Sequence, residues 1–171
     1  KGISTYFICL AIIALSLAVN IANFTKAEQT LAVPPSGKCV ILDAGHGAPD
    51  GGAVGISGVL EKDINLKITK KLQRLLEQSG TYVIMTRTDD NNTAPDNKGK
   101  IRDIKRADLK ARREYKNTPN ADIFVSIHMN KFPEQKYKGA QVFYAPNAES
   151  RAFAALMQQN LRAGLDPANK R

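Results

Sequence analysis

Two histidines occur in this sequence, and each ends a short apolar segment. His46 ends residues 40–46 (VILDAGH), and His128 ends residues 123–128 (IFVSIH). Short continuous apolar runs are typical of buried strands, so we expect both imidazoles at strand ends, above the edge of a sheet and outside its core. Neutral imidazole is the commonest metal ligand in proteins, and two histidines at one sheet edge could share a zinc ion.

The elements that would position the two histidines alternate between strand and helix. Apolar and β-branched runs predict strands at residues 39–42, 82–85, 123–127 and 141–144. Helical periodicity predicts helices at residues 61–79, 107–116 and 149–163. The alternation indicates an α/β fold, with a mostly parallel, twisted sheet and helices on both of its faces.

The helix expected over residues 61–79 has the clearest amphipathic pattern. Apolar side chains recur at helical spacing at Ile64, Ile68, Leu72, Leu75 and Leu76. Lysine and arginine occupy much of the opposite side, and Gly80 follows as a C-terminal cap. We therefore expect the apolar side to pack on the sheet.

The predicted topology offers a third metal ligand. Ligands of open α/β sheets gather outside the carboxyl ends of the strands, and the helix after the first strand begins at that same edge. Glu61 is the first residue expected in that helix. Two histidines and one carboxylate, with an open fourth position, are a standard catalytic zinc set. Taken alone, Glu61 could instead complement the helix dipole, but its coincidence with His46 and His128 at one edge favours a zinc site.

Two aspartates lie close to His46 in the sequence. Asp43 could hold a loop amide or could orient a ligating histidine, as metal sites commonly require, and the structural role is favoured. Asp50 lies in a glycine-rich segment and is expected to form a turn.

Composition suggests an anionic partner. The chain has 25 basic and 16 acidic residues, which gives a formal charge of +9. Such a surface favours nucleic acid, anionic lipid or anionic wall polymer. Residues 98–116 carry nine basic and three acidic residues, which are expected either to form a solvated helix face or to contact wall polymer or a partner protein. Nucleic-acid binding is not expected, because Tyr115 is the one aromatic residue there to stack on bases.

The first residues have the pattern of an export segment. Residues 7–19 are almost wholly apolar and follow Lys1, like the apolar and charged regions of a signal peptide. We expect residues 1–24 to be a signal peptide or a membrane anchor, residues 25–38 to be a linker, and residues 39–171 to be the folded domain. Either role of residues 1–24 places the domain outside the cytoplasm, whereas the alternative is a buried core helix.

Four segments together resemble a known family. They are residues 41–47 (ILDAGHG), 61–66 (EKDINL), 85–87 (MTR) and 121–130 (ADIFVSIHMN). In this order they resemble the zinc-dependent N-acetylmuramoyl-L-alanine amidases of the amidase_3 family, and Leu109, Arg112 and Asn117 also fit its pattern. The resemblance covers residues 40 to about 162, and it is greatest to the germination-specific, spore-cortex (CwlD-type) branch. Ala48 departs from the pattern, since the family often has glycine there.

The resemblance implies an activity, a cofactor and partners. It implies hydrolysis of the amide between N-acetylmuramic acid and L-alanine in peptidoglycan, with Zn²⁺ held by His46, Glu61 and His128. It also implies a location in the cell wall or spore cortex, an activating partner protein as a possibility, and membrane contact if residues 1–24 are retained. The family's catalytic glutamate lies in a later Val-Glu-x-Gly-Phe motif, so we expect the general base beyond Arg171 and the domain to be C-terminally incomplete.

Two other functions remain open on the sequence. A wall-binding module could keep the metal site without turnover. A zinc peptidase could act on the stem peptide instead of the amide at muramic acid. The products formed from peptidoglycan distinguish these functions.

Overall fold

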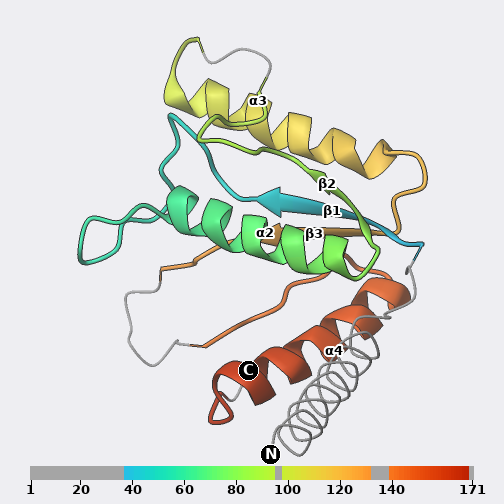
Figure 1. Cartoon of the computed structure of the whole chain (residues 1–171). Helices are drawn as coiled ribbons and strands as arrows, with labels where there is room; N and C mark the ends of the chain where they lie inside the picture. Colours follow the sequence, from blue (N-terminus) through green and yellow to red (C-terminus); the bar gives the residue numbers. More distant parts are fainter. Residues whose placement is uncertain (1–36, 95–97, 132–138, 170–171) are drawn as a thin grey trace, which may run out of the picture. The chain divides into compact units, whose positions relative to one another are not determined.

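The computed structural model describes residues 37–94, 98–131 and 139–169 (Figure 1). The expected signal or anchor segment, residues 1–24, lies outside these residues, as does the expected linker apart from Gly37 and Lys38. Among the described helices, none has the length and apolar character needed to cross a bilayer. The chain divides into two compact units, residues 1–129 and residues 130–171, and each is described separately below.

The first unit is built on a parallel sheet of three strands. These are β1 (Cys39–Ala44), β2 (Tyr82–Met85) and β3 (Ile123–Ile127), in the order β2-β1-β3. In the register, Leu42 of β1 pairs with Met85 of β2 and Val125 of β3. All six residues of β1 are buried, as expected for a central strand with neighbours on both sides. The three strands expected from the sequence in this unit are confirmed.

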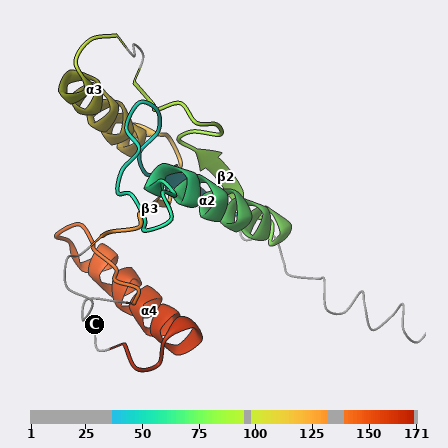
Figure 2. The same cartoon turned by 90° about the vertical axis from the view of Figure 1, so that its left-hand side faces the viewer.

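Two helices of the first unit complete the α/β fold. They are α2 (Glu61–Gln78) and α3 (Ile101–Glu114), and a short 3₁₀ helix, η1 (Tyr115–Asn117), follows α3. The connection from β1 to β2 and the connection from β2 to β3 run in opposite directions across the sheet. Because such connections are right-handed, the two helices cover opposite faces, as both views show (Figures 1 and 2). The expected α/β fold class is confirmed, although α3 begins at Ile101 and not at Ala107.

The side of α2 that faces the sheet is more polar than its sequence pattern predicts. Its buried residues are Glu61, Asn65 and Thr69, while Ile68 is 38% exposed and Leu75 is 64% exposed. Asn65 donates from Nδ2 to the carbonyl of Gly45 at 3.1 Å, and Thr69 Oγ1 donates to the carbonyl of Asn65 at 2.7 Å. The apolar positions of α2 are half-buried or exposed, because polar partners at the end of β1 determine which side of the helix is fully buried.

The second unit contains α4 (Ala148–Leu165), which confirms the helix expected at residues 149–163. Asn147 caps it, since its Oδ1 accepts from the backbone N–H of Ser150 at 2.7 Å. The strand expected at residues 141–144 does not form. The Gln158 side chain replaces a strand neighbour there, because it accepts from Val142 N–H at 2.8 Å and donates to the Ala140 carbonyl at 3.0 Å.

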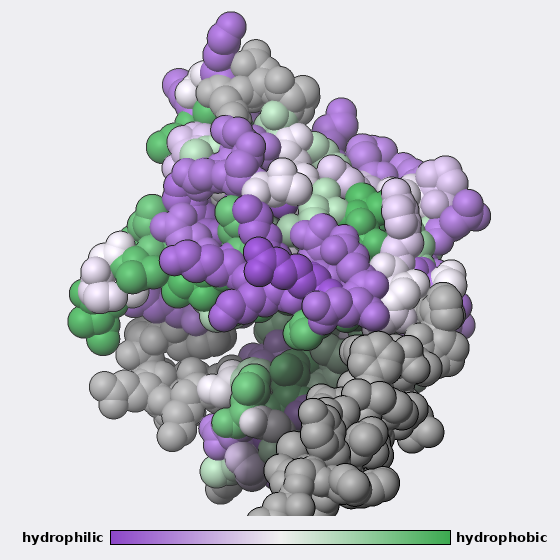
Figure 3. Space-filling view, in the orientation of Figure 1, coloured by the Kyte–Doolittle hydropathy of each residue, from purple (hydrophilic) through white to green (hydrophobic). Residues whose placement is uncertain are grey.

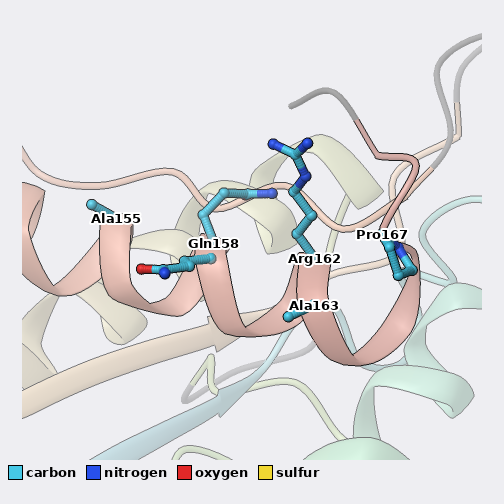
Figure 4. A pocket seen from close by; sticks show the side chains of 6 residues that line it. Ala155, Gln158, Arg162, Ala163 and Pro167 are labelled. Carbon is cyan, nitrogen blue, oxygen red and sulfur yellow. The ribbon is translucent and has the colours of Figure 1, made fainter.

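A shallow hollow lies along α4 near its carboxyl end (Figure 4). Its lining residues are Ala155, Gln158, Gln159, Arg162, Ala163 and Pro167. This set has no carboxylate, imidazole or thiol, which are the side chains that bind zinc. We therefore place no catalytic or metal site in this hollow.

A buried ionic cluster joins the elements of the first unit at the carboxyl end of β1. Asp43 on β1 accepts hydrogen bonds from Thr86 Oγ1 and Ser126 Oγ, each at 2.6 Å, so it links the ends of both neighbouring strands. It also accepts from Nη1 of Arg112 on α3. Asp43 is 3% exposed and Arg112 is 8% exposed, so the pair is shielded from water.

Replacing Asp43 with asparagine is expected to lower the free energy of unfolding by about 3–5 kcal/mol, because removing one partner leaves the other charge buried without compensation. Denaturant unfolding of the metal-free protein would measure this loss. The matched control is Asp103→Asn, since Asp103 is an exposed carboxylate in the first turn of α3. The control is expected to cost less than about 1 kcal/mol. Equal losses in the two variants would contradict the role assigned to Asp43.

Candidate metal centre

His46 lies in a tightly held turn just after β1. Its φ of 63° falls in the left-handed region, which residues other than glycine seldom adopt. The preceding residue continues the pairing with β3, because Gly45 N–H donates to the Ile127 carbonyl at 3.1 Å. The turn itself is held from α3, because Arg112 Nη2 donates to the His46 carbonyl at 2.6 Å. The backbone that carries this imidazole is therefore fixed on both sides.

His46, Glu61 and His128 come together as the sequence predicts. His46 Nε2 lies 3.2 Å from Glu61 Oε2, and His128 Nδ1 lies 3.1 Å from Glu61 Oε1. The two imidazole rings meet edge to face, with centroids 4.9 Å apart. One donor atom from each residue lies within 4.8 Å of the other two. The three residues come from the ends of β1 and β3 and from the first turn of α2, which lie at one end of the sheet (Figure 1).

Glu61 is held by groups outside its own helix. Its Oε2 accepts from Ala53 N–H and its Oε1 accepts from Met129 N–H, each at 2.8 Å. Burial acts to raise the pKa of Glu61, but these two N–H groups and the two histidines outweigh it and hold the pKa below its ordinary value. The carboxylate thus stays ionised and faces the imidazoles. Glu61 also lies in the first turn of α2, where its charge complements the helix dipole as well.

Asp50 is a member of the site that the sequence analysis did not identify. Its Oδ1 accepts from Gly52 N–H at 3.1 Å, which agrees with the expected turn. Its Oδ2 lies 2.9 Å from His46 Nδ1, and Lys105 Nζ lies 2.8 Å from Oδ1. Burial acts to raise the pKa of Asp50, but Lys105, His46 and Gly52 together lower it to about 2. The spacing of four residues after His46 was the one available signal, since it allows a compact loop to return the carboxylate to the ring.

Two glycines make the close approach of the ligands possible. A Cβ on Gly45 would lie 2.3 Å from His128 Cε1, inside the ring's contact distance. A Cβ on Gly52 would lie 2.7 Å from His46 Cδ2 and 2.8 Å from Glu61 Oε2. Gly52 also has a positive φ of 68°. The glycine-rich loop therefore provides the space that the three side chains need.

The donor set and its spacing fit zinc. A tetrahedral site with metal–ligand distances of about 2.0–2.1 Å separates its ligand atoms by about 3.3 Å. Glu61 contacts the two histidines at 3.2 and 3.1 Å through different oxygens, and one donor atom from each of the three residues lies within 4.8 Å of the other two, so small side-chain adjustments would bring them to that separation. Two imidazole nitrogens and a carboxylate oxygen leave one position of the tetrahedron open, which is the arrangement of catalytic zinc sites rather than of structural ones.

The surface of the first unit is strongly hydrophilic over α2 (Figure 3). Exposed cations on α2 are Lys67, Lys71 and Arg74. Exposed cations on α3 are Arg102, Lys105, Arg106, Lys110 and Arg113. These helices thus present exposed cations to an anionic partner, apart from Lys105, which pairs with Asp50.

Comparison with known proteins adds family relationships to this geometry. The Amidase_3 family, described as N-acetylmuramoyl-L-alanine amidase, matches residues 40–171. The germination-specific N-acetylmuramoyl-L-alanine amidase of Bacillus subtilis (strain 168) is 41% identical over 136 residues, which are 79% of this chain and 57% of that protein. The amidase LytC of the same organism is 31% identical over 144 residues, which are 82% of this chain and 26% of that protein. The chain thus spans little more than half the length of the first relative.

Solved structures agree with the sequence comparison. The CwlD amidase of Clostridioides difficile, determined in complex with the GerS lipoprotein, is 43% identical with a TM-score of 0.73, over 78% of this chain and 70% of that one. The catalytic domain of CwlV from Bacillus (Paenibacillus) polymyxa is 35% identical with a TM-score of 0.53, over 71% of this chain and 61% of that one. The chain therefore belongs to the Amidase_3 family of N-acetylmuramoyl-L-alanine amidases.

Proposed function

We propose that this protein is a zinc-dependent hydrolase that cleaves the amide between N-acetylmuramic acid and L-alanine in peptidoglycan. The observation that carries the proposal is the convergence of His46, Glu61 and His128, whose donor atoms lie within 4.8 Å of one another. This convergence lies in a chain whose family is one of amidases acting at that bond. The three residues are proposed as the zinc ligands.

The residues of the site have separate tasks in such a reaction. His46 and His128 supply neutral nitrogen donors, and Glu61 supplies the negative charge that offsets part of a divalent cation's charge. The hydrogen bonds from Ala53 and Met129 keep the Glu61 carboxylate ionised and aimed at the histidines. Zinc bound there would polarise the scissile carbonyl and lower the pKa of a water molecule toward neutrality.

A general base must also take a proton from that water and pass it to the leaving amine. Glu61 and Asp50, the carboxylates in contact with the histidines, are already bonded to imidazoles and N–H groups. Glu149 belongs to the first turn of α4 in the second unit, and Glu134 lies outside the described residues. We assign no described residue to this role, and we expect a glutamate beyond Arg171 to perform it.

The proposal extends to the setting of the reaction. The germination-specific relative supports a role in spore-cortex maturation or germination, outside the cytoplasm. Residues 1–24 are proposed as the export signal or membrane anchor, residues 25–38 as the linker, and residues 39–171 as the amidase domain. The CwlD amidase was determined with a lipoprotein bound, which supports a partner protein as activator here too. The exposed cations of α2 and α3 are suited to anionic wall polymer.

Replacing His46 or His128 with alanine is expected to abolish zinc binding, because the sequence has no third imidazole to substitute. Elemental analysis of the purified protein should give about one zinc per chain for the wild type. Both variants should bind far less while remaining folded by circular dichroism. Asp103→Asn, which alters a carboxylate on the surface of α3, should retain the metal. Full zinc occupancy in either histidine variant would overturn the assignment of the ligands.

Glu61→Gln is expected to reduce zinc affinity more than tenfold, because the amide lacks the carboxylate's negative charge. Its cost to the metal-free protein should be smaller, about 1–3 kcal/mol, for the lost charge-assisted hydrogen bonds. Competition with a chromophoric chelator measures the affinity, and denaturant unfolding measures the stability. Glu77→Gln is the matched control, since Glu77 is an exposed glutamate of the same helix. A zinc affinity within twofold of the wild type would leave Glu61 with a structural role alone.

Zinc-loaded protein extended beyond Arg171 is expected to free muramic acid from its peptide in purified peptidoglycan and to expose new N-terminal alanine. Removal of the metal with a chelator should stop the release. Cuts within the stem peptide would favour the zinc peptidase, and retention on peptidoglycan without any product would favour the wall-binding module. Turnover by residues 1–171 alone would contradict the placement of the base.

A further inference from the structure

A continuous line of polar contacts runs from the surface of α3 to the metal ligands. Lys105 Nζ on α3 lies 2.8 Å from Asp50 Oδ1. The other oxygen of Asp50 lies 2.9 Å from His46 Nδ1, and His46 Nε2 lies 3.2 Å from Glu61. The Asp50 side chain is only 15% exposed, whereas Lys105 is 46% exposed. Neither Asp50 nor Lys105 is a proposed metal ligand.

We propose that Asp50 and Lys105 are positioning residues that select the nitrogen of His46 presented to the metal. The inference rests on the zinc site proposed above. An ionised carboxylate accepts hydrogen bonds and donates none, so Asp50 favours a proton on Nδ1 of His46, while Nε2 lies beside Glu61, a proposed metal ligand. A cation held by the proposed ligands would take the lone pair of Nε2, which leaves the one proton of the ring on Nδ1, beside Asp50. Carboxylates that bond to the second nitrogen of a ligating histidine fix its tautomer and ring orientation in this way.

The two histidines differ in this respect. His128 faces Glu61 through Nδ1, and its side chain is 42% exposed. The hydrogen bonds found among the described residues give its ring no carboxylate besides Glu61. His46 has two carboxylate contacts, one on each ring nitrogen, and its side chain is 21% exposed. Of the two histidines, His46 is therefore the one whose ring orientation is held more firmly by the protein.

Lys105 gives this arrangement its anchor on a separate element. Asp50 belongs to a loop with several glycines, and such loops hold side chains loosely unless they are tied down. Its Oδ1 accepts from Gly52 N–H within the loop and from Lys105 on α3. The ion pair with Lys105 thus links the loop to α3, so the position of α3 helps to fix the orientation of the His46 ring.

The test compares Asp50→Ala, Lys105→Met and the double variant by zinc competition with a chelator. Asp50→Ala should lower zinc affinity by about 10–100-fold. Lys105→Met should lower zinc affinity by a smaller factor. Lys105→Arg, which keeps the positive charge, should lower zinc affinity much less than Lys105→Met does. The double variant should match Asp50→Ala, because Lys105 acts through Asp50. Lys110→Met, which removes an exposed lysine from the same helix, should leave the affinity unchanged.

A second measurement does not require metal. Nitrogen-15 shifts of the imidazoles in metal-free protein should show a larger share of Nδ1 protonation at His46 in the wild type than in Asp50→Ala. Asp50→Leu, which also removes the acceptor, replaces Asp50→Ala if the alanine variant does not fold. Unchanged tautomer and affinity in the Asp50 variant, or a further loss from Lys105→Met in its background, would overturn the inference. If the wild type binds no zinc, the proposed function fails, while the tautomer of His46 still tests its positioning.

Discussion

The arrangement of this protein depends on the way buried guanidinium groups hold the backbone at the end of β1. Arg87 donates from Nε to the Ala44 carbonyl at 2.7 Å and from Nη2 to the Gly45 carbonyl at 3.1 Å. Arg112 donates to the carbonyls of Ala44 and His46. Three successive carbonyls are thus bonded to cations, which offsets the strain of the positive φ at His46.

Burying two guanidinium groups side by side has an electrostatic cost that other residues must offset. Burial lowers the pKa of Arg87 most, and the repulsion from Arg112 lowers it further. Asp43 and Asp108 both accept hydrogen bonds from Arg112 and supply the opposite charge. Asp43 therefore does not orient a histidine directly. Asp43 acts indirectly, because it accepts a hydrogen bond from Arg112, and Arg112 in turn donates to the His46 carbonyl.

The convergence of His46, Glu61 and His128 was predictable from the sequence, because topology alone brings these three residues together. The ends of β1 and β3 and the start of α2 must meet at one edge of a parallel sheet, whatever the details of packing. Side-chain contacts between residues far apart in the sequence could not be predicted in this way. Asn65 lies on the buried side of α2, where it contacts the Gly45 carbonyl at the end of β1. No strand forms near Val142, whose N–H donates to the Gln158 side chain and not to a neighbouring strand. The ion pair of Asp50 was not predicted for the same reason, since its partner Lys105 lies 55 residues further along the chain, on α3.

The charges around His46, Glu61 and His128 are balanced by groups from other parts of the fold. Glu61 and Asp50 both contact His46, so their negative charges lie on either side of one ring. Two carboxylates this close would repel each other if nothing opposed them. Lys105 offsets the charge of Asp50, and the N–H groups of Ala53 and Met129 stabilise Glu61. These contacts hold the carboxylates in place, so a cation bound as proposed would lose less of its binding free energy to ordering the chain.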